Sequence, residues 1–307
     1  MKRRIIPLIL ALSIVMALAG CSGTQKDSEI ILYDGDFSEM QLVHTMIKQL
    51  VEHHTDATVT IKDRMSAVNM FKELTGNKSC DLMFSYDGTL LTTFLKLDPD
   101  DVPQGQTLFD FANEKAREQY GVYLVGKVGL NNTYAIGVTQ DVVDTYGVTT
   151  ISDLIPIASE LKIGAEPEFC TLEGSMKYDP FVAYYGLHFK QLIQVDVMLK
   201  YTAAEEGNFE VMVVYATDGM NKRTNLTVLE DDRHFFPEYN GAILVTEGLF
   251  EKFKDAAPNL EEVLNMLNGN ISTEDMIDLT YQVDVEGKDI AEVSRAFLES
   301  KGLLPAG

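Results

Sequence analysis

The sequence has no tryptophan, only three cysteines and nine prolines among its 307 residues, and basic side chains are scarce. Lysine and arginine total 25 against 47 aspartate and glutamate residues, which gives a formal net charge of −22. Such a surface repels phosphate backbones, so the composition predicts no nucleic-acid partner. Apolar residues still make up 46% of the chain. That share is enough for a substantial core and excludes a disordered or collagen-like protein.

Long apolar runs are absent except at the N-terminus, where Lys2, Arg3 and Arg4 precede an apolar stretch over residues 5–19. A membrane-spanning helix needs about 20 apolar residues, and this stretch ends earlier in a polar segment. We therefore interpret residues 1–20 as an export signal peptide. Its removal takes away three positive charges, which leaves the mature chain at −22 − 3 = −25.

The end of this signal carries a more specific motif. Leu18-Ala19-Gly20-Cys21 resembles the lipobox of bacterial lipoproteins, in which the cysteine thiol becomes the lipid attachment point. This resemblance implies a lipid on Cys21, a lipidated linker over residues 21–28, and a location on the outer face of the cytoplasmic membrane. A plain signal peptide with a coincidental cysteine is the alternative. Cys80 and Cys170 belong to no metal-spaced cluster, and we expect two buried free thiols, although the sequence leaves their pairing open.

Motifs that would indicate catalysis are missing. The sequence contains no Gly-x-Ser-x-Gly elbow, no His-Glu-x-x-His pair and no phosphate-binding loop. We therefore predict that the protein is not an enzyme and holds neither a cofactor nor a metal ion. Any ATP hydrolysis would then take place on another subunit.

From residue 29 onward, short β-branched runs alternate with helical periodicity, which is typical of an α/β sheet protein. Ser38 and Gln41 have the spacing of a capping box at the start of a helix over residues 38–54. Further helices are expected over residues 151–160 and 247–267.

The alternation divides the chain into two units. We predict lobe I over residues 29–135 and 240–307 and lobe II over residues 136–239, with the C-terminal helices covering lobe I. No Pro/Gly-rich linker separates the units, so crossing strands rather than a flexible tether are expected to join them.

Four tyrosines lie at the ends of expected strands beside turn residues. They are Tyr86, Tyr134, Tyr215 and Tyr239. Aromatic side chains in loops on a rigid scaffold are binding candidates, whereas tyrosines within helices more often belong to the core.

Six stretches of the chain have a distinctive sequence: Asp36-Phe37-Ser38-Glu39, Tyr86-Asp87-Gly88-Thr89, Gly129-Leu130-Asn131-Asn132-Thr133-Tyr134-Ala135, Tyr215-Ala216-Thr217-Asp218-Gly219, Phe236-Pro237-Glu238-Tyr239-Asn240-Gly241-Ala242 and Tyr281-Gln282-Val283-Asp284-Val285-Glu286-Gly287-Lys288. In these stretches the chain resembles the substrate-binding proteins of ABC importers for osmoprotectants, which carry glycine betaine, carnitine, choline and related quaternary ammonium compounds. The resemblance implies a two-lobed periplasmic-binding-protein clamshell, type II-like, each lobe a β-sheet flanked by helices. Its cleft would hold a trimethylammonium head in a cage of tyrosines that matches Tyr86, Tyr134, Tyr215 and Tyr239. The partners it implies are an ABC permease and an ATPase subunit.

The sequence departs from this family where members hold the other end of the ligand. Met40 stands where many relatives carry glutamine, and Leu172 stands where betaine binders place a basic residue for the carboxylate. Thr89 retains a hydroxyl, and Asp87 beside it is a further candidate. A buried carboxylate without a partner is costly, so we expect choline to be preferred over glycine betaine.

Two alternatives stay open from the sequence. One is a sensory lipoprotein that keeps the fold but has lost transport, and the other is a transporter component for a different small solute. An anion site would favour arginine, lysine or helix N-terminal amides over four tyrosines.

Overall fold

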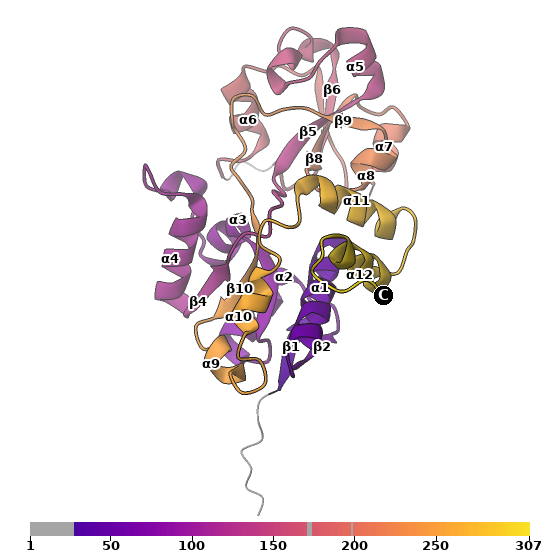
Figure 1. Ribbon diagram of the computed structural model, residues 1–307. Coiled ribbons are helices and arrows are strands. Elements are labelled where there is room, and N and C mark those ends of the chain that lie inside the picture. Colours follow the sequence, from indigo (N-terminus) through magenta and orange to yellow (C-terminus); the bar gives the residue numbers. More distant parts are fainter. Residues whose placement is uncertain (1–27, 171–173, 198) are drawn as a thin grey trace, which may run out of the picture.

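The computed structural model describes residues 28–170, 174–197 and 199–307. It is a mixed α/β protein with two lobes, which lie one above the other in Figure 1. Within the described residues, no helix is both long and apolar enough to cross a membrane.

Lobe I combines a parallel pair of strands, a three-stranded antiparallel sheet in the order β3-β10-β4, and most of the helices. Its strands are β1 (Glu29–Tyr33), β2 (Thr58–Lys62), β3 (Leu82–Tyr86), β4 (Val122–Val125) and β10 (Gly241–Thr246). Its helices are α1 (Ser38–His54), α2 (Ala67–Lys72), α3 (Asp87–Thr89), α4 (Leu108–Tyr120), α9 (Leu249–Phe253), α10 (Leu260–Asn265), α11 (Thr273–Asp284) and α12 (Ile290–Ser300).

Lobe II is built on one five-stranded sheet in the order β7-β6-β8-β5-β9. Its strands are β5 (Tyr134–Thr139), β6 (Lys162–Ala165), β7 (Gln191–Gln194), β8 (Val211–Tyr215) and β9 (Leu226–Val228). Its helices are α5 (Gln140–Tyr146), α6 (Tyr178–Tyr185), α7 (Lys200–Glu205) and α8 (Met220–Arg223). The β6–β8 pair is parallel and the β5–β8 pair antiparallel. The carboxyl ends of β6 and β8 therefore share one sheet edge with the start of β5.

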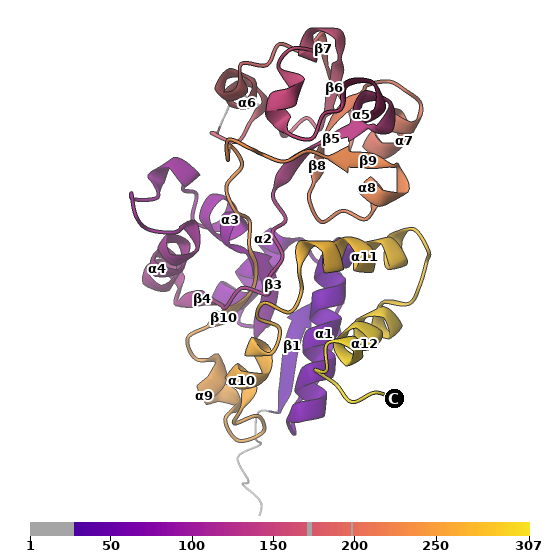
Figure 2. The same ribbon diagram turned by 45° about the horizontal axis from the view of Figure 1, so that its top comes forward.

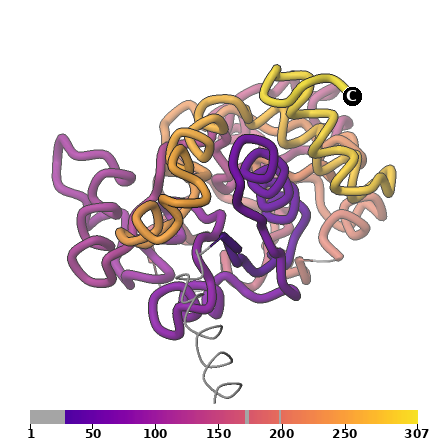
Figure 3. Tube along the Cα trace, turned by 60° about the horizontal axis from the view of Figure 1, so that its bottom comes forward, coloured from indigo at the N-terminus to yellow at the C-terminus, as the bar shows by residue number. Residues whose placement is uncertain are grey.

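Helix α1 is the central element of lobe I. It contacts β2 and β3 and also packs against α10, α11 and α12, and Figure 3 shows it beside the C-terminal segments. Because α1 has neighbours on several sides, even the polar Glu39, Gln41 and His44 are buried in its first turns. The C-terminal helices α10, α11 and α12 thus pack on α1.

The helix over residues 38–54 has the predicted bounds, but its predicted capping box is wrong. Phe37 occupies the N-cap position and Ser38 is already helical. The Ser38 hydroxyl instead donates to Asp284 of α11 at 2.6 Å, and the Gln41 amide donates to the Gly35 carbonyl at 2.9 Å. Tertiary partners have therefore replaced the local capping bonds.

Two other predicted helices are interrupted by proline. Residues 151–160 form two short 3₁₀ segments, Ile151–Leu154 and Ala158–Glu160, and the stretch 247–267 divides into α9 and α10. Pro156 and Pro258 lack the N–H that an α-helix needs and clash with the preceding turn.

The two lobes are joined by two chain segments that run side by side. Asn131 and Asn240 form an isolated antiparallel bridge. The backbone N–H of Tyr239 donates to the Asn131 side chain at 2.7 Å, and the N–H of Asn132 donates to the Tyr239 carbonyl at 3.0 Å. Paired segments of this kind are stiffer than a flexible tether.

Helix α11 of lobe I also reaches the other lobe, and both Figure 1 and Figure 2 show it between the lobes. The backbone N–H of Gly219 donates to the Thr280 hydroxyl at 3.0 Å, and that hydroxyl also lies 3.1 Å from the Thr217 carbonyl. A second cross-lobe contact joins the Ser175 hydroxyl to the Asp98 carboxylate at 2.8 Å.

Replacing Gly219 with alanine should loosen the α11 contact. A Cβ there would lie 2.4 Å from the backbone nitrogen of Tyr281, and a backbone atom cannot move aside cheaply. We expect a local cost of about 1–3 kcal/mol. Hydrogen exchange at Thr280 should then accelerate roughly 5- to 150-fold, while α1 exchanges as before. Gly248→Ala, where nothing lies within 4 Å, is the control. Equal exchange in both variants contradicts the packing argument.

Candidate ligand-binding site

Tyr134 and Tyr215 form an aromatic pair on the edge of lobe II. They stand directly opposite each other in the β5–β8 register, so both side chains lie on the same face of the sheet. Their ring centroids are 5.3 Å apart with an interplanar angle of 25°. The pair is therefore stacked and fixed by strand pairing.

Tyr86 and Tyr239 form a second pair on the lobe I side. Tyr86 ends β3, Tyr239 lies in the second connecting segment, and the ring centroids are 5.5 Å apart. The hydroxyl groups of Thr89 and Tyr239 lie 2.9 Å apart. Gly88 makes this packing feasible, because a Cβ there would lie 1.9 Å from the Tyr239 ring.

Both pairs lie close to the segments that connect the lobes, because Tyr134 begins the strand after the first segment and Tyr239 lies in the second. The charge of Glu168, which lies in lobe II, helps to raise the pKa of both Tyr134 and Tyr239, although burial is the largest cause for each. Burial also raises the pKa of Tyr86 and Tyr215. All four phenols therefore stay protonated and neutral at physiological pH. We call the region of these four rings the inter-lobe junction.

Glu39, in the first turn of α1, is a buried acid at the junction. Its carboxylate accepts a short hydrogen bond from the Tyr86 hydroxyl and one of 3.2 Å from the Asn132 amide. The side chain of Thr217, just beyond β8, also bonds to it. Burial raises the pKa of Glu39 to about 7, against the effect of these hydrogen bonds. One acid thus links lobe I, a connecting segment and lobe II.

A second buried acid lies beneath the lobe II pair. Glu166 follows β6, accepts a 2.7 Å hydrogen bond from the Tyr215 hydroxyl, and lies 3.4 Å from the Lys200 ammonium. Lys200 is 1% exposed, and its nitrogen lies 4.5 Å from the centroid of the Tyr215 ring. Burial lowers the pKa of Lys200. The Tyr215 ring therefore already contacts a protein cation.

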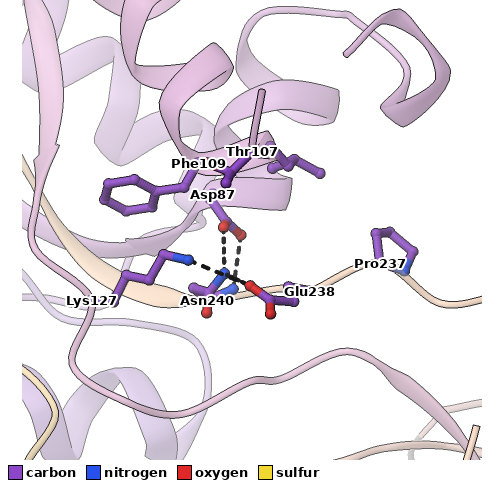
Figure 4. Close-up of a pocket in the computed structure, with 8 residues that line it drawn as sticks. Asp87, Thr107, Phe109, Lys127, Pro237, Glu238 and Asn240 are labelled. Carbon is purple, nitrogen blue, oxygen red and sulfur yellow. Dashed lines mark hydrogen bonds and ion pairs between the residues drawn. The ribbon is translucent and has the colours of Figure 1, made fainter. Parts of the chain in front are cut away.

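Asp87 holds the second connecting segment in place. Its carboxylate accepts hydrogen bonds from the Asn240 backbone at 2.8 Å, the Asn240 amide at 2.7 Å and the Gly88 backbone at 2.8 Å. Burial raises its pKa to about 6. Asp87 also lines a cavity of about 320 Å³ that includes Lys127 and Glu238 and none of the four tyrosines (Figure 4).

The remaining predicted residues fall in different places. Met40 is 2% exposed and belongs to the lobe I core. Leu172 and Cys21 lie outside the described residues. Cys80 is buried and Cys170 half-buried, and both are free thiols. No group of three or more His, Cys, Asp or Glu side chains suited to a metal ion occurs within the described part of the chain.

The sequence reasoning missed the polar residues around the rings, namely Glu39, Asn132, Glu166, Lys200 and Thr217. Glu39, Asn132 and Thr217 lie within the stretches that carry the family resemblance, so that signal was available for these three. Nothing local distinguishes Glu166 or Lys200 from surface residues.

The chain is similar in sequence to solute-binding components of ABC transporters. A family model for the substrate-binding domain of the ABC-type glycine betaine transport system (OpuAC) matches residues 28–300. The carnitine transport binding protein OpuCC of Listeria monocytogenes is 29% identical over 307 residues, covering 97% of each chain. The ergothioneine transport permease/ergothioneine binding protein EgtU of Helicobacter pylori is 31% identical over 224 residues, or 73% of this chain and 38% of EgtU.

Among solved structures, a glycine betaine/carnitine/choline ABC transporter protein superposes with a TM-score of 0.79 at 27% identity, covering 89% of this chain and 99% of that one. This match confirms the predicted two-lobed α/β fold. Because the family model extends over almost all of the described chain, the protein belongs to the substrate-binding domains of ABC-type glycine betaine transport systems, which bind solutes and are not enzymes.

Proposed function

We propose that this protein captures a quaternary ammonium compound, such as choline, glycine betaine or carnitine, at the inter-lobe junction and delivers it to an ABC permease. The ligand-binding residues in this proposal are Tyr86, Thr89, Tyr134, Tyr215 and Tyr239. The observation that carries it is the presence of two tyrosine pairs, one on each side of the junction, with ring centroids 5.3 and 5.5 Å apart.

The chemistry of the ligand class suits neutral aromatic rings. A quaternary ammonium has no N–H to donate, and its diffuse charge is attracted to the faces of aromatic rings. Proteins that recognise choline or methyl-lysine surround the cationic head with such rings. Anions would instead require cationic or N–H donors.

Ring contacts alone do not account for tight binding. Each face contributes about 0.5–2 kcal/mol, so four faces supply at most roughly 2–8 kcal/mol, and the Tyr215 ring already contacts the Lys200 ammonium. A micromolar dissociation constant requires about −8 kcal/mol after association costs of about 4 kcal/mol or more. Closure of the lobes must add the rest by burying methyl groups and expelling water. The cross-lobe contacts of Gly219 and Ser175 are consistent with such closure.

The preferred ligand in this proposal lacks a strongly anchored carboxylate, which favours choline over glycine betaine. Met40 is apolar and lies in the core, so it offers no hydrogen bond to the far end of a ligand. Thr89 offers a hydroxyl, already 2.9 Å from that of Tyr239. Asp87 serves the site by fixing Asn240, the residue after Tyr239.

The lobe division and the lipid anchor are part of the same proposal. One apolar core joins residues from 30–130 to residues from 242–304, and the other cores use residues from 135–236. This partition supports lobe I over residues 29–135 and 240–307 and lobe II over residues 136–239. A signal peptide over residues 1–20 and a lipid on Cys21 would hold the protein on the outer face of the cytoplasmic membrane.

The ligand preference can be measured by calorimetric titration of the delipidated protein with choline, glycine betaine, carnitine and ergothioneine. We expect choline to bind more tightly than glycine betaine, because a betaine carboxylate would be buried without a basic partner. Tighter binding of glycine betaine would overturn this preference and leave the ligand class intact. Failure of all four compounds to bind would overturn the class itself.

Truncating a ring should weaken binding without unfolding the protein. Tyr239→Ala and Tyr215→Ala should each cost about 1–3 kcal/mol, or roughly 5- to 150-fold in affinity. Tyr239→Phe keeps the ring and should lose less. Tyr146→Ala, on an exposed part of α5, is the control. Wild-type affinity in both alanine variants would refute the aromatic cage.

The anchor is tested by changing its attachment point. Cys21→Ser removes the thiol that accepts the lipid, so the protein should move from the detergent phase to the aqueous phase in a Triton X-114 partition. Cys80→Ser serves as the control and should still partition with the detergent. Retention of the Cys21→Ser protein in the detergent phase would argue against lipidation at this position.

A further inference from the structure

In the part of the chain that the structure describes, Glu39 lacks the cationic partner that two other buried acids, Glu166 and Asp81, have beside them, and it shares this lack with Asp87. Glu166 lies 3.4 Å from Lys200, and Asp81 lies 2.6 Å from Lys252. Within residues 28–170, 174–197 and 199–307, no lysine, arginine or histidine nitrogen comes within 4.0 Å of the Glu39 carboxylate. Glu39 is nevertheless only 3% exposed.

The groups that face Glu39 supply hydrogen bonds and further negative charge. Tyr86 of β3 and Asn132 of the first connecting segment donate to it, and Thr217 bonds to it from lobe II. The charge of Asp218 disfavours ionisation of Glu39. Asp284 of α11 accepts a bond from the neighbouring Ser38. Within the described residues, the neighbours of Glu39 thus hold its carboxylate in place without supplying a positive charge.

A buried carboxylate is stable when it is paired with a cation or protonated. The Tyr86 hydroxyl that donates to Glu39 belongs to a ring of the junction, which also packs against Tyr239 with its centroid 5.5 Å away. A negative acceptor on that hydroxyl increases the electron density of the ring and its attraction for a cation. A single hydrogen bond, donated by Tyr86, therefore connects Glu39 to the rings of the junction.

We propose that Glu39 is the counter-charge of the ligand, a specificity-determining residue whose carboxylate, acting with Tyr86, selects a permanent cation over a neutral molecule of the same shape. This inference rests on the proposed function, because it assumes that the ligand enters the inter-lobe junction. Glu39 is not assigned a direct contact with the ligand.

Proton release follows from this role. Burial raises the pKa of Glu39 to about 7, so the free protein holds a partial proton there at neutral pH. A bound cation favours the ionised form and lowers this pKa, so binding releases a proton. The affinity for a cation should then rise with pH up to about 7, by at most tenfold per pH unit for one proton, and level off above it.

The test compares choline with 3,3-dimethyl-1-butanol, in which a neutral carbon replaces the ammonium nitrogen. Glu39→Gln keeps the size of the side chain and removes its charge. Glu292→Gln makes the same change on an exposed part of α12 and is the matched control. Affinities are measured by calorimetry from pH 6 to 8 in buffers of different ionisation enthalpy, which also counts the protons released.

We expect Glu39→Gln to bind choline at least tenfold more weakly at pH 8, with a flat pH profile and no proton release. Its affinity for the neutral alcohol should stay within twofold of wild type, as should both affinities of Glu292→Gln. Choline affinity within twofold of wild type in Glu39→Gln would overturn the inference.

Proton counting in the wild-type protein provides a result that does not depend on the folding of the variant. Choline binding without proton release between pH 6 and 8 would overturn the role of Glu39 and leave the proposed ligand class standing. A folded wild-type protein that binds no trimethylammonium compound would overturn the proposed function, and the inference with it.

Discussion

The arrangement of the junction depends on the pairing of the two segments that connect the lobes. Asn131 and Asn240 bridge these segments, and buried Asp87 fixes Asn240 by both its backbone and its side chain. Tyr134 lies three residues after one side of this bridge, and Tyr239 immediately precedes the other. The rings of Tyr134 and Tyr239 are therefore attached close to the segments that join the lobes. A rotation of one lobe against the other would displace these two rings least.

Hydrogen bonds then orient rings that strand geometry brings together. Tyr134 and Tyr215 are aligned by the β5–β8 register, whereas Tyr86 is tied through its hydroxyl to Glu39. Gly88 leaves the space that the Tyr239 ring fills. Backbone pairing therefore fixes where each ring is attached. The orientation of the ring then depends on a hydrogen-bond partner, as for Tyr86, or on space left by a glycine, as for Tyr239.

Electrostatics acts at two ranges. The net charge of −22 favours the approach of cations to the whole surface, although salt screens this attraction beyond about 8–10 Å. At short range two of the buried acids, Glu166 and Glu39, have different partners. Glu166 forms an ion pair with Lys200. Within the described residues, Glu39 instead accepts hydrogen bonds from Tyr86 and Asn132 and has no cation beside it. The same residue type thus serves as half of an internal ion pair in one lobe and as a hydrogen-bonded acid in the other.

The sequence by itself determined the alternation of strands and helices, the bounds of α1 and the positions of Tyr86, Tyr134 and Tyr215 at strand ends, since hydrophobic period and turn chemistry are local properties. It also showed the lack of familiar catalytic motifs. Only the tertiary structure decided that Ser38 bonds to Asp284 rather than capping its own helix, and which tyrosine faces which. It likewise showed that Glu39 is one of the few acids buried within the described residues. Partners far apart in the chain meet only after folding, and burial and charge compensation depend on those partners.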